Sequence, residues 1–570
     1  MAVRGQDEFL NLPFQGKLEF LYGLPARHKR DLILSAPEAE RLVQSFAPET
    51  LFYTVKEIGS ADAGDLLSLA LPEQVKSLFD LDCWDKDRPN TARMREWIEA
   101  LAEGGRRRMA DGLMELDLEL MSILLRGYIK VHRLEDAASS PDAPSNRFVQ
   151  FDENYLIEFI RHDAITQHIS DFLDEAFERD YNYFSALMEE IYWGAEAELE
   201  EAAYQFRRAR LNDRGFPDFF EAQSIFNYLD PAEFERIRAQ YESPDRADLT
   251  GDADVIPPEM ALTEAGGDRS LFNTALAAGF AAQGRRQVRS EMAMVTNEVL
   301  VARSIDFGDS EAVRVAVEMT HDYLNLALEH LAGGGLDTAI AHLRDTHLKL
   351  LFRLGVSLTV DLRTRAERET ANLGLSPREA REISYLDSPY REAIAGFTMR
   401  QPRFFAALDG AGAVEMRDFR TMRDLHLSYG VLDQVAAMAE LMRGLLGIDI
   451  ASAGFRASVA ASEVRLSQIL LTALVRNALD GRLAPDPIEE SRLGAARAAF
   501  MASNGKPARL AEQFRAMVAG AISARLDGAA RRSDDFVDSC LHALEEEFAD
   551  LGGKRAIDPR FIRTLLVRRG

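Results

Sequence analysis

Prolines at short, regular intervals constrain the fold of this chain more than any other feature of its sequence. Residues 24–82 divide into registers of about twelve residues, and Pro25, Pro37, Pro48 and Pro72 stand near the starts of four of them. Proline lacks an N–H donor and has a fixed φ, so it suits the first turn of a helix and disrupts the interior. Because apolar residues follow each start at helical spacing, we predict a series of short helices that begin at these prolines.

Helices of about two turns are not stable alone in water, so each must bury its apolar side against its neighbours. Registers such as SAPEAERLVQSF and APETLFYTVKEIG carry this pattern, and residues 24–82 resemble the superhelical cytoplasmic N-domain of MgtE-type magnesium transporters. The resemblance implies a superhelix of short stacked helices. It does not imply magnesium binding, because Arg41, Lys56 and Lys76 replace acidic positions that hold ions in such repeats.

A longer run resembles a second group of proteins. LPARHKRDLILSAPEAERLVQSFAPETLFYTVKEIG, followed by DLDCW at residues 80–84, is similar to the start of a bacterial family of comparable length and unknown function. This resemblance extends over most of the chain. It implies no activity, substrate or catalytic residue.

The rest of the chain is predicted to be mainly α-helical. Apolar stripes indicate helices over 91–103, 107–126 and 153–211, whereas YIKVHRL at 128–134 and RFVQF at 147–151 alternate and predict a small β-hairpin near 128–151. We expect a short-helix superhelical domain at 1–85, a helical domain at 86–241, a linker or mobile loop at 242–269 and a C-terminal helical domain at 270–570. The linker is rich in proline, glycine and aspartate and has no period.

Composition restricts the classes of function. The chain of 570 residues has a formal net charge of −26, which opposes general binding to nucleic acid or anionic lipid. Its two cysteines, Cys83 and Cys540, cannot form a four-thiolate metal site, and Cys83 lies among carboxylates that oppose thiolate formation, so we expect it to be a buried apolar residue. With no apolar run of about 18 residues and no signal-peptide core, we expect a cytoplasmic protein without membrane insertion.

The one candidate metal pair is Glu318 and His321. Their i,i+3 spacing lets a carboxylate and an imidazole share a helix face, as in carboxylate-bridged di-iron bundles. Those bundles need two such pairs, and the sequence has one. The alternative is an ordinary packing or surface histidine, so metal and cofactor binding stay open.

Other motifs have weaker functional meaning. The doublet His162-Asp163 is similar to that of HD-type phosphohydrolases but lacks the remaining residues of that site, and the aspartates of DRADLTGDADV do not have EF-hand spacing. The arginine clusters at 106–108 and 285–289 are basic enough to bind phosphate, but we expect them to form ion pairs within the chain.

Two hypotheses of function remain. The first is a helical scaffold or adaptor that binds another protein, because the chain combines stacked short helices with an acidic charge and no complete catalytic motif. The second is an enzyme or sensor that binds a metal or a small ligand in a pocket within 290–360. We assign no catalytic or cofactor-binding residue, and the oligomeric state is left open.

Overall fold

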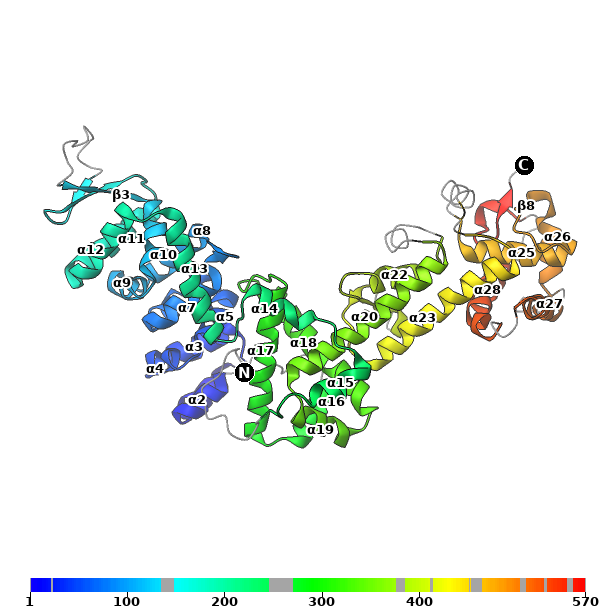
Figure 1. The fold of residues 1–570 in the computed structure, drawn as a ribbon, viewed down its shortest axis with the longest axis horizontal. Coiled ribbons are helices and arrows are strands. Elements are labelled where there is room, and N and C mark those ends of the chain that lie inside the picture. The colour runs from blue at the N-terminus through cyan, green and yellow to red at the C-terminus, as the bar shows by residue number, and fades with distance from the viewer. Residues whose placement is uncertain are drawn as a thin grey trace. The chain divides into compact units, whose positions relative to one another are not determined.

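The computed structural model describes residues 2–21, 24–134, 148–244, 270–375, 385–410, 414–450, 452, 464–502, 509–526, 530–550 and 557–568. It is mainly α-helical, with a few short strands (Figure 1), so the predicted fold class is confirmed. The chain forms two compact units. Unit 1 comprises Met1–Asn227 and Glu233–Arg353, and unit 2 comprises Tyr228–Ala232 and Leu354–Gly570. The four-part division predicted from the sequence stays a prediction, and residues 245–269 of its linker lie outside the described residues.

The proline registers do begin helices. Pro48 and Pro72 are the first residues of their helices, Pro25 is an N-cap, and Pro37 lies two residues before its helix. The first part of unit 1 contains α1 (Ala2–Asn11), α2 (Phe14–Leu21), α3 (Ala26–Ser35), α4 (Ala39–Gln44), α5 (Pro48–Ile58), α6 (Gly64–Leu67) and α7 (Pro72–Asp82). Here α3 packs against α4 and α5, and α5 packs against α7.

These helices are held together by their apolar faces, as their lengths require. Leu42 and Val43 of α4 and Leu66 and Leu67 of α6 are buried. Gln74 adds a polar link, because its side-chain amide donates hydrogen bonds to the carbonyls at the end of α4 and beyond. The superhelical repeat and the likeness to magnesium transporters stay predictions.

The predicted hairpin near 128–151 is wrong in its pairing. Both predicted strands exist, but a third strand lies between them: the antiparallel order is β3 (Ile129–Arg133), β5 (Tyr155–Phe159), β4 (Phe148–Gln150). The sequence of β5, YLIEF, was assigned to a helix from residue 153. Its buried residues recur with period two, which is the strand pattern.

The predicted helix over 107–126 is also divided, into α9 (Arg106–Met114) and α10 (Leu118–Arg126). Asp117 between them has an extended backbone, and its carboxylate pairs with Lys76 and Arg210. Unit 1 continues through β1 (Trp84–Asp85), β2 (Arg88–Pro89), α8 (Thr91–Ala102), α11 (Ala164–Arg179), α12 (Tyr181–Trp193), α13 (Glu196–Asp213), α14 (Phe219–Gln223) and α15 (Phe234–Arg238).

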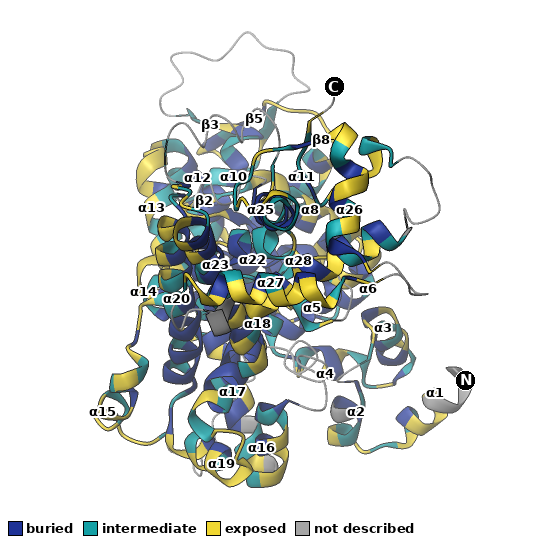
Figure 2. Ribbon diagram, turned by 90° about the vertical axis from the view of Figure 1, so that its right-hand side faces the viewer, coloured by how far each residue is buried: buried dark blue, intermediate teal, exposed yellow. Residues whose placement is uncertain are grey.

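The last part of unit 1 is a helical group around α18. It contains α16 (Leu271–Gly279), α17 (Ala282–Ala302), α18 (Ser310–Ala332), α19 (Leu336–Asp345) and the start of α20 (Leu348–Asn372). Residues 319–328 of α18 are all buried, so this part of the helix is enclosed on every side, whereas Glu311 and Arg314 near its start are exposed (Figure 2).

Unit 2 is built mainly of helices, with two short strand pairs. Helix α23 (Met422–Glu440) packs against α28 (Ala530–Asp550), and α25 (Leu466–Asp480) packs against α26 (Leu493–Phe500). Its described elements after α20 are α22 (Tyr390–Phe397), β6 (Phe404–Phe405), β7 (Met416–Arg417), α23 (Met422–Glu440), a π-helical turn (Leu441–Leu445), α25 (Leu466–Asp480), β8 (Ile488–Glu489), α26 (Leu493–Phe500), α27 (Glu512–Ser523), α28 (Ala530–Asp550) and β9 (Val567–Arg568). In neither unit does a described helix have the length and apolar character needed to cross a membrane.

Candidate functional site

The structure places the two candidate metal ligands in different surroundings. Glu318 pairs with Arg314 on a partly exposed face of α18, whereas His321 is 1% exposed and its Nε2 lies 3.2 Å from Oγ of Ser270. Among the described residues, no group of three or more His, Cys, Asp or Glu side chains could hold a metal ion. The Glu318–His321 metal site therefore stays a prediction without further ligands around it.

The same region brings a serine, a histidine and an aspartate together. Nδ1 of His321 lies 3.6 Å from Oδ1 of Asp322, which is too long for a hydrogen bond. Oγ of Ser270 accepts a hydrogen bond from the Asn273 N–H as the N-cap of α16. All three side chains are buried, so the arrangement has the composition of a hydrolase triad but not its geometry.

Other predicted candidates have structural roles. Asp163 is the N-cap of α11, in a capping box with Thr166, and its neighbour His162 is exposed. Arg106 and Arg108 form ion pairs with acidic side chains of the same chain, as predicted. The aspartates from residue 245 and the side chain of Arg286 lie outside the described residues.

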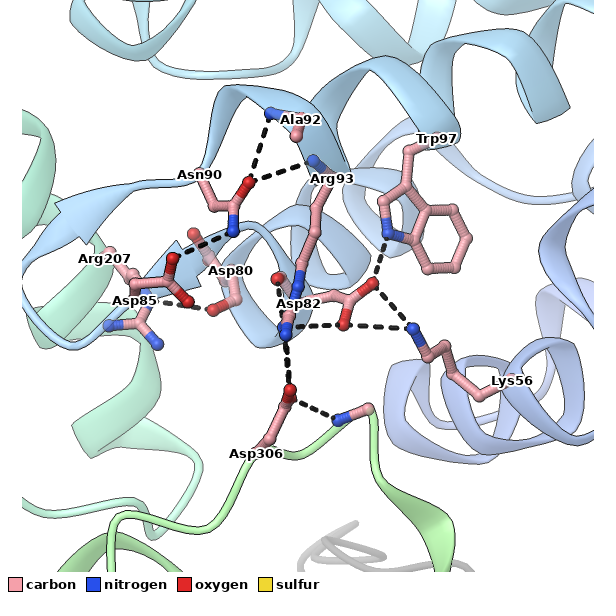
Figure 3. Close-up of polar contacts among 11 residues, drawn as sticks. Lys56, Asp80, Asp82, Asp85, Asn90, Ala92, Arg93, Trp97, Arg207 and Asp306 are labelled. Carbon is pink, nitrogen blue, oxygen red and sulfur yellow. Dashed lines mark hydrogen bonds and ion pairs between the residues drawn. The ribbon is translucent and has the colours of Figure 1, made fainter.

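A buried carboxylate ends α7. The side chain of Asp82 is 2% exposed, and its Oδ2 accepts hydrogen bonds from Nζ of Lys56 at 2.9 Å and Nε1 of Trp97 at 2.8 Å (Figure 3). Its Oδ1 accepts from Lys56 at 3.2 Å and from Nη1 of Arg93 at 3.3 Å. Two cations and one indole thus compensate the buried charge. Next to it, Cys83 is fully buried, as predicted, and burial raises the pKa of its thiol.

The same network reaches the loop between α17 and α18. Nη1 of Arg93 also donates to Oδ1 of Asp306 at 3.0 Å, and the N–H of Gly308 donates to that oxygen at 2.9 Å. Burial alone raises the pKa of Asp306, but these hydrogen bonds outweigh it and hold the pKa below its usual value. A Cβ atom on Gly308 would lie 2.6 Å from Oδ1 of Asp82 and 2.9 Å from Nζ of Lys56. Glycine at position 308 therefore lets the loop lie this close to the two side chains.

A second buried carboxylate, Asp80, lies two residues earlier in α7. Asp80, whose side chain is 5% exposed, accepts from Nε and Nη2 of Arg210 at 2.7 and 2.8 Å. Burial raises the pKa of Asp80, although Arg210 opposes the shift. Arg210 also bonds Asp117 through two contacts of 3.0 and 2.6 Å. The carboxylates of α7 therefore link this helix to α5, α8 and α13, and Arg93 extends the same network to the α17–α18 loop.

A cavity of about 700 Å³ lies beside this network. Its wall consists of the end of α7, the β1–β2 hairpin, α13, residues 216–220 and residues 301–307. Trp84, Tyr204, Phe216 and Phe307 supply aromatic surface. A cavity of this size with mostly apolar walls and a few polar groups is typical of a binding site.

Two residues that line this cavity have an unfavourable backbone conformation, and one buried donor there has no hydrogen-bond partner. Lys86 (φ 60°) and Ser304 (φ 53°) both line it, and they are the non-glycine residues with left-handed φ in the described part of the chain. Such strain gathers at functional sites. In addition, Nε1 of Trp84 is buried and has no hydrogen-bond partner, and burying a donor in this way costs about 1–3 kcal/mol.

Two arginines, Arg207 and Arg208, belong to the polar part of the wall. The guanidinium of Arg207 lies over the ring of Trp84, 5.0 Å from its centroid. Its Nε donates to the carbonyl of Asp80 at 2.7 Å, and its Nη1 donates to the carbonyl of Lys86 at 3.4 Å. Its neighbour Arg208 instead pairs with Asp218 at 3.4 Å.

The mouth of the cavity carries exposed aromatic side chains. Phe219 is 42% and Phe220 is 83% exposed, and their ring centroids are 5.6 Å apart. Both residues begin α14, and Asp218 caps this helix by accepting from the N–H of Phe220. This aromatic rim, Phe219 and Phe220, is the largest exposed apolar feature of the cavity.

Sequence reasoning did not find this site. It singled out DLDCW at 80–84 as part of a family resemblance but gave those residues no role. Two sequence features do belong to the site: the closely spaced acids and aromatics of DLDCWDKD, and the pair FF at 219–220. They are far apart in the sequence, and only the fold brings them to one cavity.

Comparison with known proteins gives one match. The model of a family of unknown function, DUF6178, matches residues 6–568, which confirms the predicted resemblance to a family of that kind over most of the chain. No curated protein and no solved structure matches the chain.

Proposed function

We propose that this chain, which belongs to the DUF6178 family, is a helical adaptor that binds another protein at the aromatic rim. The observation that carries the proposal is the exposure of Phe220, 83%, at the mouth of a preformed cavity. Burying one phenylalanine side chain stabilises a complex by about 1.5–3 kcal/mol, so a partner that covers Phe220 would gain binding free energy. Exposed apolar groups next to a cavity are typical of interaction sites, and aromatic side chains are common among residues that dominate binding.

The charge of the chain limits the kind of partner. A net charge of −26 attracts basic or amphipathic protein surfaces and repels nucleic acid and anionic lipid. Together with the two buried free cysteines, the lack of a membrane-spanning helix among the described residues supports a cytoplasmic location.

The proposal is tested by co-isolation from native lysate. Purified wild-type protein, the Phe219→Ala/Phe220→Ala double variant and the Phe206→Ala variant serve as three matched baits. Phe206 is 48% exposed on α13 and does not line the cavity. We expect a partner at near-stoichiometric amount with the wild-type and Phe206→Ala baits, and about a tenfold lower amount with the double variant, because rim residues of this kind contribute about 2 kcal/mol or more. Equal recovery by all three baits would remove the rim from the proposal.

The second candidate function is a sensor or enzyme that binds a small ligand. It is favoured by the cavity, whose residues 301–307 fall within the predicted range 290–360. The metal-dependent form of this candidate rests on Glu318 and His321, which bond to other side chains.

A further inference from the structure

We infer that the cavity beside α7 binds a small organic anion, with its charged group held by Arg207, Lys86 and the indole N–H of Trp84. This inference deepens the second candidate function, on which it rests, and it does not require the adaptor proposal to be correct. It names the chemical class of the ligand: a flat apolar body that carries a carboxylate, sulfonate or phosphate.

The first argument is the supply of unused donors on one part of the wall. Trp84 is 6% exposed, and its Nε1 has no hydrogen-bond partner. Arg207 bonds two carbonyl oxygens and forms no ion pair with any described residue. Its position over the Trp84 ring, and its contact with the Lys86 carbonyl, bring these three residues together.

Among the described residues Arg207 has no ion-paired carboxylate, unlike two other arginines of α13. Arg208 and Arg210, one and three residues further along α13, both pair with aspartates. Burial lowers the pKa of Arg207 to about 10, so its guanidinium keeps its charge near neutral pH. The Asp80 carboxylate bonds Arg210 and acts on Arg207 only through space, so an anionic ligand in the cavity would add a counter-charge at contact distance.

The second argument is that two of the four acids of the wall, Asp218 and Asp306, are already paired with arginines. Asp306 accepts from Arg93 and Gly308, and Asp218 accepts from Phe220 and pairs with Arg208.

Two further acids, Asp85 and Asp87, lie at the exposed tip of the β1–β2 hairpin. Asp85 accepts from the side-chain amide of Asn90, which leaves its charge in place. Both carboxylates are hydrated, whereas Arg207 is half-buried, where electrostatic interactions are stronger. The inner part of the cavity therefore favours an anion.

The net charge of −26 does not prevent an anion from binding in this cavity. Charges further away than about 8 Å are largely screened at physiological ionic strength, and the donors of the wall act at contact distance. Hydrogen bonds that involve an ionised group contribute about 1.5–3 kcal/mol each, more than neutral ones. The aromatic walls and the volume of about 700 Å³ suit a ring-bearing ligand of ordinary small-molecule size.

The test uses two fluorescent probes with the same rings. Anilinonaphthalene sulfonate carries a negative charge, and N-phenylnaphthylamine is its neutral counterpart. Each is titrated into the full-length wild-type protein, and into the Arg207→Met, Trp84→Phe and Arg107→Met variants, with circular dichroism as a check of folding.

We expect the wild-type protein to bind one equivalent of the sulfonate at least about tenfold more tightly than the neutral amine, with an affinity that falls as salt is added. Arg207→Met should weaken sulfonate binding about tenfold and leave the amine unchanged, and Trp84→Phe should weaken the sulfonate several-fold. Arg107→Met should change neither probe by more than about twofold, because Arg107 is exposed on α9 and does not line the cavity.

Each contrary result has its own meaning. Equal affinity of the wild-type protein for both probes, or unchanged sulfonate binding by folded Arg207→Met, overturns the anion inference and leaves the small-ligand candidate standing. Binding of neither probe overturns both. If Arg207→Met does not fold, the comparison of the two probes on the wild-type protein, with its salt dependence, still decides the question.

Discussion

The Asp82→Ala variant is expected to lose about 3–5 kcal/mol of the free energy of unfolding of unit 1. The substitution removes the carboxylate that bonds Lys56, Arg93 and Trp97, and it leaves two partly buried cations and one buried N–H without that acceptor. The cost is large because the remaining groups lose compensation that water cannot replace in the buried network.

Urea unfolding followed by tryptophan emission measures this loss. All three tryptophans of the chain, Trp84, Trp97 and Trp193, lie in unit 1, so the signal reports that unit without unit 2. The matched control is Asp85→Ala, which removes an exposed carboxylate three residues away and should change the free energy by no more than about 0.5 kcal/mol. Equal losses in the two variants would contradict the structural role of Asp82.

The Trp97→Ala variant is expected to destabilise unit 1 by about 3–5 kcal/mol. Trp97 is 1% exposed, it lies near Phe52 with ring centroids 6.3 Å apart, and it donates to Asp82. Truncation leaves a large cavity between α5 and α8 and also removes one donor from a buried carboxylate, so the packing and hydrogen-bond losses act in the same direction.

Two variants separate these contributions in urea unfolding followed by circular dichroism. Trp97→Phe keeps an aromatic ring and removes the N–H, so it should lose about 1–2 kcal/mol. Trp193→Ala removes a tryptophan that is 66% exposed and should lose no more than about 0.5 kcal/mol. A loss at Trp193 as large as that at Trp97 would show that burial does not govern the effect.

The sequence predicts local structure well where one physical signal dominates. Pro48 and Pro72 begin helices because a missing N–H and a fixed φ act within one turn, and neighbours do not alter that effect. Cys83 is buried as predicted because both its type and its surrounding acids disfavour an exposed thiolate. The third strand of the small sheet was missed because YLIEF is short and adjoins a helical region, where period two is easily hidden.

The site could not be predicted in the same way. Arg93 and Asp306 are 213 residues apart, and no local pattern indicates that they meet. The role of Gly308 depends on the position of Asp82, which belongs to another segment. Likewise, the lack of a carboxylate partner for Arg207 is visible only when the neighbours of α13 are known. The i,i+3 spacing of Glu318 and His321 suggested one shared site, but Glu318 pairs with Arg314 of the same helix and His321 contacts Ser270 at the start of α16.

The most direct test of the central claim, that a partner protein contacts the aromatic rim, is photo-crosslinking in the native cell. A photoreactive phenylalanine, p-benzoylphenylalanine, is placed at position 220 in one strain and at position 206 in another, since both positions hold exposed phenylalanines of unit 1. We expect irradiation to give a discrete adduct of higher mass from position 220, containing one specific protein, and no such adduct from position 206. The same adduct from both positions, or none from position 220 in a folded protein, would contradict the proposal.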